Sequence, residues 1–224
     1  MTGIESVMFI LEPTNVGDHT DDLITFGELP ERVKAFGYFV DLSMLSPGDI
    51  LLFDGVEPTK GGRAVKVIQS KSFEETHARW SHAAIYISKG VIVEALPRGG
   101  VVERSISEYV PGYTIRALRI PDLSEAERFE IAFAALRKTK QYYSLVGAGF
   151  EFVRVTLNLQ NSKYRIGRMV FCSQICYASI IEGAGVFPEG CPIADVVYPA
   201  ALSGSSTFES VKLRWARING VSEY

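Results

Sequence analysis

Two short apolar strands joined by a glycine-containing turn constrain the fold of this chain more than any other feature. The first strand covers residues 83–87, the turn reads Ser88-Lys89-Gly90, and the second strand covers residues 91–96. Apolar runs of this length on either side of a short turn are typical of an antiparallel hairpin. Further strands are expected over residues 49–53, 100–104 and 113–120.

Two helices are expected after the strands. Ser124 and Glu127 form a capping box, which predicts a helix from residue 125 to about residue 139. Helical spacing places four apolar residues of this helix on one face: Phe129, Ala132, Phe133 and Leu136. The second helix is predicted over residues 172–182 and is expected to end at Gly183 and Gly185.

Composition narrows the class of protein. The chain has 224 residues, of which 47% are hydrophobic and 22% charged, enough to bury a substantial core. Its formal net charge of -3 gives no basic field for nucleic acid. The three cysteines, an odd and low number, argue against a disulfide scaffold and leave free thiols for chemistry.

His82 begins the first strand of the hairpin and has a candidate partner on the second strand. If Ser88-Lys89-Gly90 is a three-residue loop with glycine in the left-handed conformation, His82, Ala84 and Tyr86 share one face and Ala84 lies opposite Glu94. Glu94 is then the diagonal neighbour of His82, roughly 7–8 Å away between backbones. A carboxylate there can hold the imidazole ring in one tautomer and orientation. A two- or four-residue loop would turn Glu94 to the other face.

Cys172 is the only cysteine at a predicted helix start. Unsatisfied N–H groups and the helix dipole stabilise a thiolate there, and the same N–H groups can bind the oxyanion that forms after attack. These features suggest Cys172 as nucleophile, His82 as general base and then acid, and Glu94 as the orienting group. The alternatives are a buried structural cysteine, a packed strand histidine and a solvated glutamate. No spacing indicates a metal site, and no cofactor is expected.

Several segments, in this order, resemble the circularly permuted NlpC/P60 papain-like hydrolases of the YiiX/YaeF type. Residues 45–53 resemble the strand before the family's histidine, residues 80–87 its histidine strand, residues 91–95 the strand with its acidic third member, and residues 171–175 its cysteine helix. Tyr143-Ser144 resembles a tyrosine-containing element upstream of the cysteine, and residues 193–202 weakly resemble the segment that follows it. The family often has an acidic residue two places after the cysteine, where this chain has Gln174.

The resemblance implies an α+β papain-like core, with an antiparallel sheet packed against the helix that carries the cysteine. It also implies a cysteine hydrolase acting through an acyl-thioester, first of all an amidase or peptidase on cell-wall (peptidoglycan) peptides. A lipid acyl hydrolase or acyltransferase, phospholipase-like, is the first alternative, and a non-catalytic binding domain is the second. Substrate or oxyanion contacts are expected from Ser173, Gln174, Tyr143 and Tyr86.

Residues 1–44 are expected to form an N-terminal arm, and residues 45–224 the catalytic domain. No apolar stretch approaches the roughly 20 residues that span a bilayer, so no integral membrane segment is expected. The first residues lack the positive charge of a secretory signal, so a cytoplasmic location is the default, with export by a dedicated secretion system left open. A peptide or an acyl lipid is the expected partner; the oligomeric state stays open.

Overall fold

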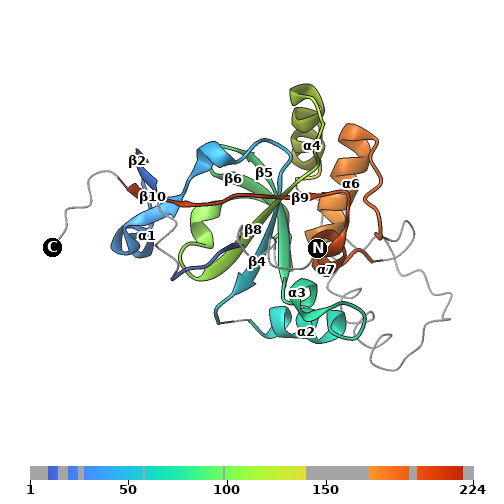
Figure 1. Cartoon of the computed structure of the whole chain (residues 1–224), viewed down its shortest axis with the longest axis horizontal. Coiled ribbons are helices and arrows are strands. Elements are labelled where there is room, and N and C mark those ends of the chain that lie inside the picture. The colour runs from blue at the N-terminus through green and yellow to red at the C-terminus, as the bar shows by residue number, and fades with distance from the viewer. Residues whose placement is uncertain are drawn as a thin grey trace, which may run out of the picture.

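The structure is a computed structural model that describes residues 10–14, 20–24 (backbone only), 28–57, 59–97, 99–139, 172–191 and 196–218. It combines two sheets with helices, so the predicted α+β class with an antiparallel sheet is confirmed (Figure 1). Among the described residues, no helix is both long and apolar enough to cross a bilayer.

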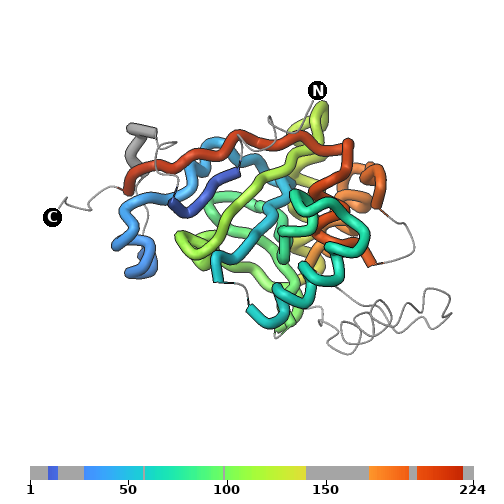
Figure 2. The backbone as a smooth tube through the Cα atoms, turned by 60° about the horizontal axis from the view of Figure 1, so that its bottom comes forward, coloured from blue at the N-terminus to red at the C-terminus, as the bar shows by residue number. Residues whose placement is uncertain are grey.

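The larger sheet has seven strands, in the order β1-β8-β4-β5-β6-β7 with β9 also on β8, and every pair is antiparallel. Its strands are β1 (Ile10–Leu11), β4 (Ile50–Gly55), β5 (His82–Ser88), β6 (Val91–Leu96), β7 (Gly100–Ser105), β8 (Tyr113–Arg119) and β9 (Glu209–Val211). The smaller sheet has the order β2-β10-β3: β2 (Thr20–Ile24), β10 (Trp215–Ile218) and β3 (Tyr38–Val40). Figure 2 shows the C-terminal segment crossing the molecule to reach this second sheet.

The helices cover mainly one face of the large sheet. α4 (Glu125–Arg137) and α6 (Cys172–Ala184) lie side by side, and α6 packs on β5 (Figure 1). The remaining helical segments are α1 (Glu31–Phe36), α2 (Lys60–Gln69), α3 (Glu75–Ala78), α7 (Pro199–Gly204) and the 3-10 turns η3 (Leu42–Met44) and η4 (Ile106–Glu108).

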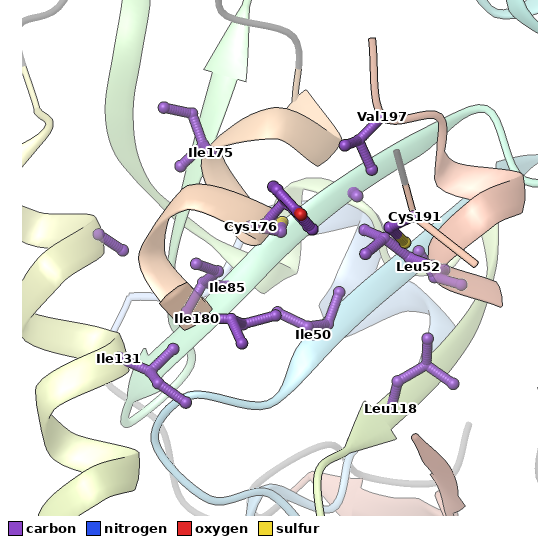
Figure 3. Close-up of a cluster of buried hydrophobic side chains, with 14 of the residues drawn as sticks. Ile50, Leu52, Ile85, Leu118, Ile131, Ile175, Cys176, Ile180, Cys191 and Val197 are labelled. Atoms are coloured by element: carbon purple, nitrogen blue, oxygen red, sulfur yellow. The ribbon is translucent and has the colours of Figure 1, made fainter. Parts of the chain in front are cut away.

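The strands bury side chains on both faces, which gives the molecule two cores. The first core, between the sheet and α4 and α6, contains Ile85 and Ile180 (Figure 3). Trp80 belongs to the same core. The second core lies on the opposite face and contains Phe53 and Trp215. Strand side chains alternate between faces, so consecutive apolar residues in β4 and β5 supply both cores at once.

Several described residues of the segment 1–44 belong to the second core. Leu11, Val33, Phe39 and Val40 are all at most 1% exposed and pack against side chains of β4 and β8. The division of the chain at residue 44 stays a prediction, but these residues share a core with the sheet that follows them.

The turn of the hairpin differs from the expected one. Lys89 and Gly90 both have positive φ, at 48° and 82°, and Ser88 pairs with Val91, so the loop has two residues rather than three. The pairing shifts between Tyr86 and Ser88, which marks a β-bulge. The loop is one residue shorter than predicted, and the bulge places one extra residue in β5. The pairing of the strand before the bulge therefore stays in the predicted register.

Because of this compensation, the predicted pairing of Ala84 with Glu94 is confirmed although the predicted loop is wrong. A positive φ at both turn positions matches the right-handed twist of a two-residue hairpin. Lys89 gave no sign of this in the sequence, since a lysine seldom adopts that conformation.

The capping box at Ser124 and Glu127 is confirmed, and α4 ends at Arg137, two residues before the expected end. The apolar face is only partly as expected. Ala132 is buried, but Phe129 and Phe133 are 51% and 54% exposed, while Ile131 is buried instead. α4 approaches α6 closely beside Ile131, where a Cβ on Gly183 would lie 2.4 Å from the Ile131 backbone nitrogen.

Candidate active site

His82 opens β5 on the face of the second core, close to the end where the helix α6 begins. Its side chain is 17% exposed, and its ring lies 6.0 Å from that of Phe53, the residue with which it pairs on β4. The predicted position at the start of the strand is confirmed. One edge of the imidazole therefore reaches the surface of a cavity while the rest is fixed by the sheet.

Glu94 lies at the centre of β6 and is fully buried. Its Oε2 accepts a hydrogen bond from His82 Nε2, so the diagonal contact expected from the hairpin is present. Arg104 Nε lies 3.8 Å from the other carboxylate oxygen. Burial alone would raise the pKa of Glu94, but the His82 contact, a hydrogen bond from Tyr109 and the Arg104 charge together lower it. The carboxyl is therefore held as a carboxylate.

Cys172 is half-buried and is the first described residue of α6. Its thiol forms a hydrogen bond with the His82 ring, and the backbone N–H groups of Ala83 and Ser173 also point at the sulfur. Because Nε2 of His82 contacts Glu94, Nδ1 is the ring nitrogen left for the sulfur. The Cys172 sulfur, the His82 imidazole and the Glu94 carboxylate are thus brought together in this order.

The electrostatics of the site favour a charged pair. Burial opposes charge on His82, but the Cys172 sulfur and Glu94 on either side of the ring raise its pKa to about 10. Burial would raise the pKa of Cys172, yet the His82 charge and hydrogen bond lower it. A cysteine whose pKa falls below that of its histidine partner exists largely as thiolate and imidazolium, which is the reactive state of a nucleophilic thiol.

The other two cysteines lie in surroundings that disfavour the thiolate. Cys176 is fully buried one turn along α6, and burial raises its pKa well above the ordinary value. Burial raises the pKa of Cys191 to about 11. Figure 3 shows both among the apolar side chains of the first core. Both are therefore inert thiols, and Cys172 is the candidate nucleophile among the three.

Tyr109 is a site residue that the sequence analysis missed. Its hydroxyl donates a hydrogen bond to Glu94 Oε2, the same oxygen that contacts His82. Its ring stacks on Phe53, with centroids 3.9 Å apart, and lies nearly parallel to the His82 ring at 5.9 Å. Tyr109 follows a 3-10 turn in an irregular segment, so no periodic pattern connects it with β6.

A cavity of about 710 Å³ opens beside the cysteine and histidine. Much of its wall is apolar, with Val65 and Ile68 of α2 on one side and Val197 and Pro199 on another. The polar side chains that line the cavity include Arg104. The arrangement can receive a substrate with its carbonyl at the sulfur and an apolar group along the wall.

The described residues that were expected to contact the substrate or the oxyanion differ in their positions and hydrogen-bond partners. Ser173 lines the cavity, but its hydroxyl donates to Val197 O at 2.6 Å, which leaves its backbone N–H as the group facing the sulfur. Gln174 is not among the described residues that line the cavity, and its Oε1 is buried. Tyr86 lies at the far end of the hairpin, where its hydroxyl accepts from Gly90 N. Tyr143 lies outside the described residues.

Comparison with known proteins supports the fold. No family model matches the sequence, and no curated protein does. Five solved protein chains match, among them the metalloprotein YiiX from Escherichia coli O157:H7. That match has a TM-score of 0.53 and 14% sequence identity, and covers 75% of this chain and 97% of that chain. At this identity the likeness shows a common fold alone.

Proposed function

We propose that this chain is a cysteine hydrolase that works through an acyl-thioester on Cys172. The observation that carries the proposal is the contact of a half-buried, pKa-lowered thiol with an imidazole whose other nitrogen is held by a buried carboxylate. The resemblance to circularly permuted NlpC/P60 papain-like hydrolases supports the same assignment. An intact set of three groups argues against a binding domain without chemistry.

In the proposed reaction the Cys172 thiolate attacks the carbonyl carbon, and the carbonyl π electrons move to oxygen. The backbone N–H groups near the sulfur are the candidate donors to this oxyanion. As the intermediate collapses, His82 Nδ1 gives its proton to the leaving amine or alkoxide and the thioester forms. Neutral His82 then takes a proton from water, whose oxygen attacks the thioester, and the acid and the thiolate are released.

Glu94 takes no proton in these steps. It accepts from Nε2 throughout, which keeps Nδ1 directed at the sulfur and stabilises the imidazolium. The structural neighbour YiiX is a metalloprotein. Among the residues described for this chain, no three His, Cys, Asp or Glu gather in a group that would hold a metal ion, and the proposed steps use none.

Two substrate classes follow from the proposal. The resemblance favours an amide bond in a cell-wall peptide. The apolar wall of the cavity, formed by Val65, Ile68, Val197 and Pro199, specifically favours the second candidate, a lipid acyl ester. Both use the same three groups, because a thiolate attacks amide and ester carbonyls by the same steps.

Parallel assays test the function and separate the substrates. The protein is incubated with muropeptides and, separately, with phospholipid vesicles; release of free amines supports the peptidase and release of fatty acid supports the lipid hydrolase. We expect an acyl-enzyme adduct on Cys172 that hydroxylamine cleaves, detected by mass spectrometry. Cys172→Ala should lose both adduct and turnover, whereas Cys191→Ala, the matched control at a buried thiol, should keep them. Persistent turnover in Cys172→Ala would overturn the assignment.

A further inference from the structure

Glu94 Oε2 accepts two hydrogen bonds, one from His82 Nε2 and one from the hydroxyl of Tyr109. The same carboxylate oxygen is therefore held by the tyrosine as well as by the histidine. The Tyr109 ring is itself fixed by stacking on Phe53, with an interplanar angle of 22°. A side chain restrained at both its ring and its hydroxyl is suited to fix the carboxylate that it contacts.

The segment that carries Tyr109 is anchored by a residue of α1. Arg32 Nη2 donates to Ser107 O at 2.8 Å, and Arg32 Nε donates to Val110 O at 3.2 Å. These two carbonyls stand on either side of Tyr109 in the sequence, so a single guanidinium clamps the backbone around it. The planar fork of arginine suits two acceptors at once, which a lysine ammonium on its single flexible stem does not match.

A second route leads from Arg32 to the same carboxylate through charges. Arg32 lies 3.7 Å from Glu108, Glu108 lies 2.9 Å from Arg104, and Arg104 lies 3.8 Å from Glu94 Oε1. The side chains of Arg32 and Glu108 are 48% and 42% exposed, so solvent screens this route and its effect on the site is small. The clamp on the backbone is the stronger of the two routes.

We propose that Tyr109 is a positioning residue for the Cys172–His82 pair, and that Arg32 acts on the site by holding Tyr109 in place. The inference rests on the proposed function, since it assigns these residues to the reactivity of the same thiol. It also gives the N-terminal segment, which bears none of the three reactive groups, a part in the activity.

Loss of the Tyr109 hydroxyl has two opposed effects on the thiol. Removing a donor concentrates negative charge on Glu94, which would strengthen its attraction for imidazolium and lower the thiol pKa. Releasing Glu94 from its fixed position weakens its hold on the ring and raises the thiol pKa. If Tyr109 positions Glu94, the second effect is the larger. The other ionisable groups that act on the pair from neighbouring elements are Arg104 on β7 and Cys176 on α6.

Alkylation by iodoacetamide, followed against pH with the labelled peptide identified by mass spectrometry, measures the thiol pKa without a substrate. In Tyr109→Phe the ring stacking is retained, and we expect the apparent pKa of Cys172 to rise by about 0.5–1 unit, which slows alkylation about threefold to tenfold below that pKa. Tyr177→Phe is the matched control: that tyrosine is buried on α6 and its hydroxyl has no partner among the described residues. An unchanged or lowered pKa in Tyr109→Phe would overturn the proposal.

Arg32→Ala should raise the thiol pKa in the same direction, and should add nothing in the Tyr109→Phe background if it acts through Tyr109. Arg32→Lys keeps the charge but not the two-carbonyl clamp, so it should reproduce most of the effect even if the alanine variant folds poorly. Arg137→Ala is the control at a comparably exposed arginine remote from the cavity. Additive shifts, or full rescue by lysine, would contradict the clamp.

These outcomes separate the inference from the proposed function. A wild-type Cys172 that alkylates with the pKa of an ordinary thiol refutes the activated nucleophile itself. If the pKa of Cys172 is low in the wild type and the Tyr109 and Arg32 variants do not raise it, only the positioning role is refuted. Thermal melting of each variant distinguishes both results from a loss of folding.

Discussion

At the scale of single residues, the charge on Cys172 depends on one neighbour. Burial acts on all three cysteines in the same direction, raising the pKa of each, and only at Cys172 does an opposing group exceed it. That group is His82, which contributes both a positive charge and a hydrogen bond. Strand periodicity predicted that Glu94 faces Ala84, and this pairing holds because a bulge offsets the wrongly predicted loop. The contact of His82 with Cys172 joins distant segments and was expected from their residue types and from the family resemblance. The sequence did not predict Tyr109, whose contact depends on how an irregular segment folds back over β6.

Replacing the histidine tests the source of the low thiol pKa. In His82→Ala, burial of Cys172 is no longer opposed by the imidazolium, so its pKa should rise to its ordinary value of 9.0 or above. We expect alkylation at pH 7 to slow by tenfold or more. A thiol that stays reactive would show that the helix terminus alone, rather than His82, sets its pKa.

In the proposed reaction, the histidine also sets the upper limit of the pH range for turnover. Its folded pKa of about 10 lies above the ordinary 6.5, so the proton on His82 stabilises the fold fully below pH 6.5, and this stabilisation is lost as the pH rises through about 10. Thiolate and imidazolium coexist between the lowered pKa of Cys172 and about 10. Turnover against pH should therefore form a plateau that falls on the basic side near pH 10; a fall near pH 7 would contradict the raised His82 pKa.

Glu94→Gln tests the orienting role. The amide has the same shape but no charge, so it holds the ring without stabilising the imidazolium. We expect kcat to fall by on the order of 10²-fold with KM nearly unchanged. Equal loss in kcat and in substrate affinity would indicate a role in binding instead. Circular dichroism of the variant provides the control for folding.

At the scale of elements, the contact between α4 and α6 could not be predicted from helical periodicity. Helical spacing correctly predicted both helices, but Gly183, expected to end the second, lies inside it; Gly185, with a φ of 66°, follows the helix end. A Cβ on Gly183 would lie 2.4 Å from the backbone nitrogen of Ile131. The glycine therefore permits the close packing of α6 on α4. A single sequence gives no sign of which glycine serves which purpose.

Gly183→Ala measures this close approach. The methyl group would meet backbone, which cannot move away as a side chain can, so we expect a destabilisation of about 1–3 kcal/mol, or more, by chemical denaturation. Gly61→Ala in α2 is the matched control, since its Cβ would have no neighbour nearer than 4.0 Å. The control should be neutral or gain up to about 1 kcal/mol from helix propensity. Equal effects at both positions would contradict the packing role.

At the scale of the whole molecule, each of the two sheets joins segments from both ends of the described chain. β1 and β9 both pair with β8, and β10 pairs with β2 and β3. Residues 1–44 were expected to form an arm. Their burial depends on partners such as Trp215, far along the chain, and pairing over such separations leaves no local signal. The antiparallel hairpin of β5 and β6 was predictable, because its two strands follow each other in the sequence and leave a local pattern.

The two cores make the two tryptophans independent optical reporters. Trp80 lies in the first core and Trp215 in the second, and the chain has no other tryptophan. Closing a pair such as Ala216 with Thr20 requires a very long loop, which slows its formation relative to neighbouring strands. In stopped-flow refolding, the fluorescence of Trp215→Phe, which reports Trp80, should therefore reach its native value before that of Trp80→Phe. Coincident traces would mean that the sheet becomes ordered on both sides in one kinetic step.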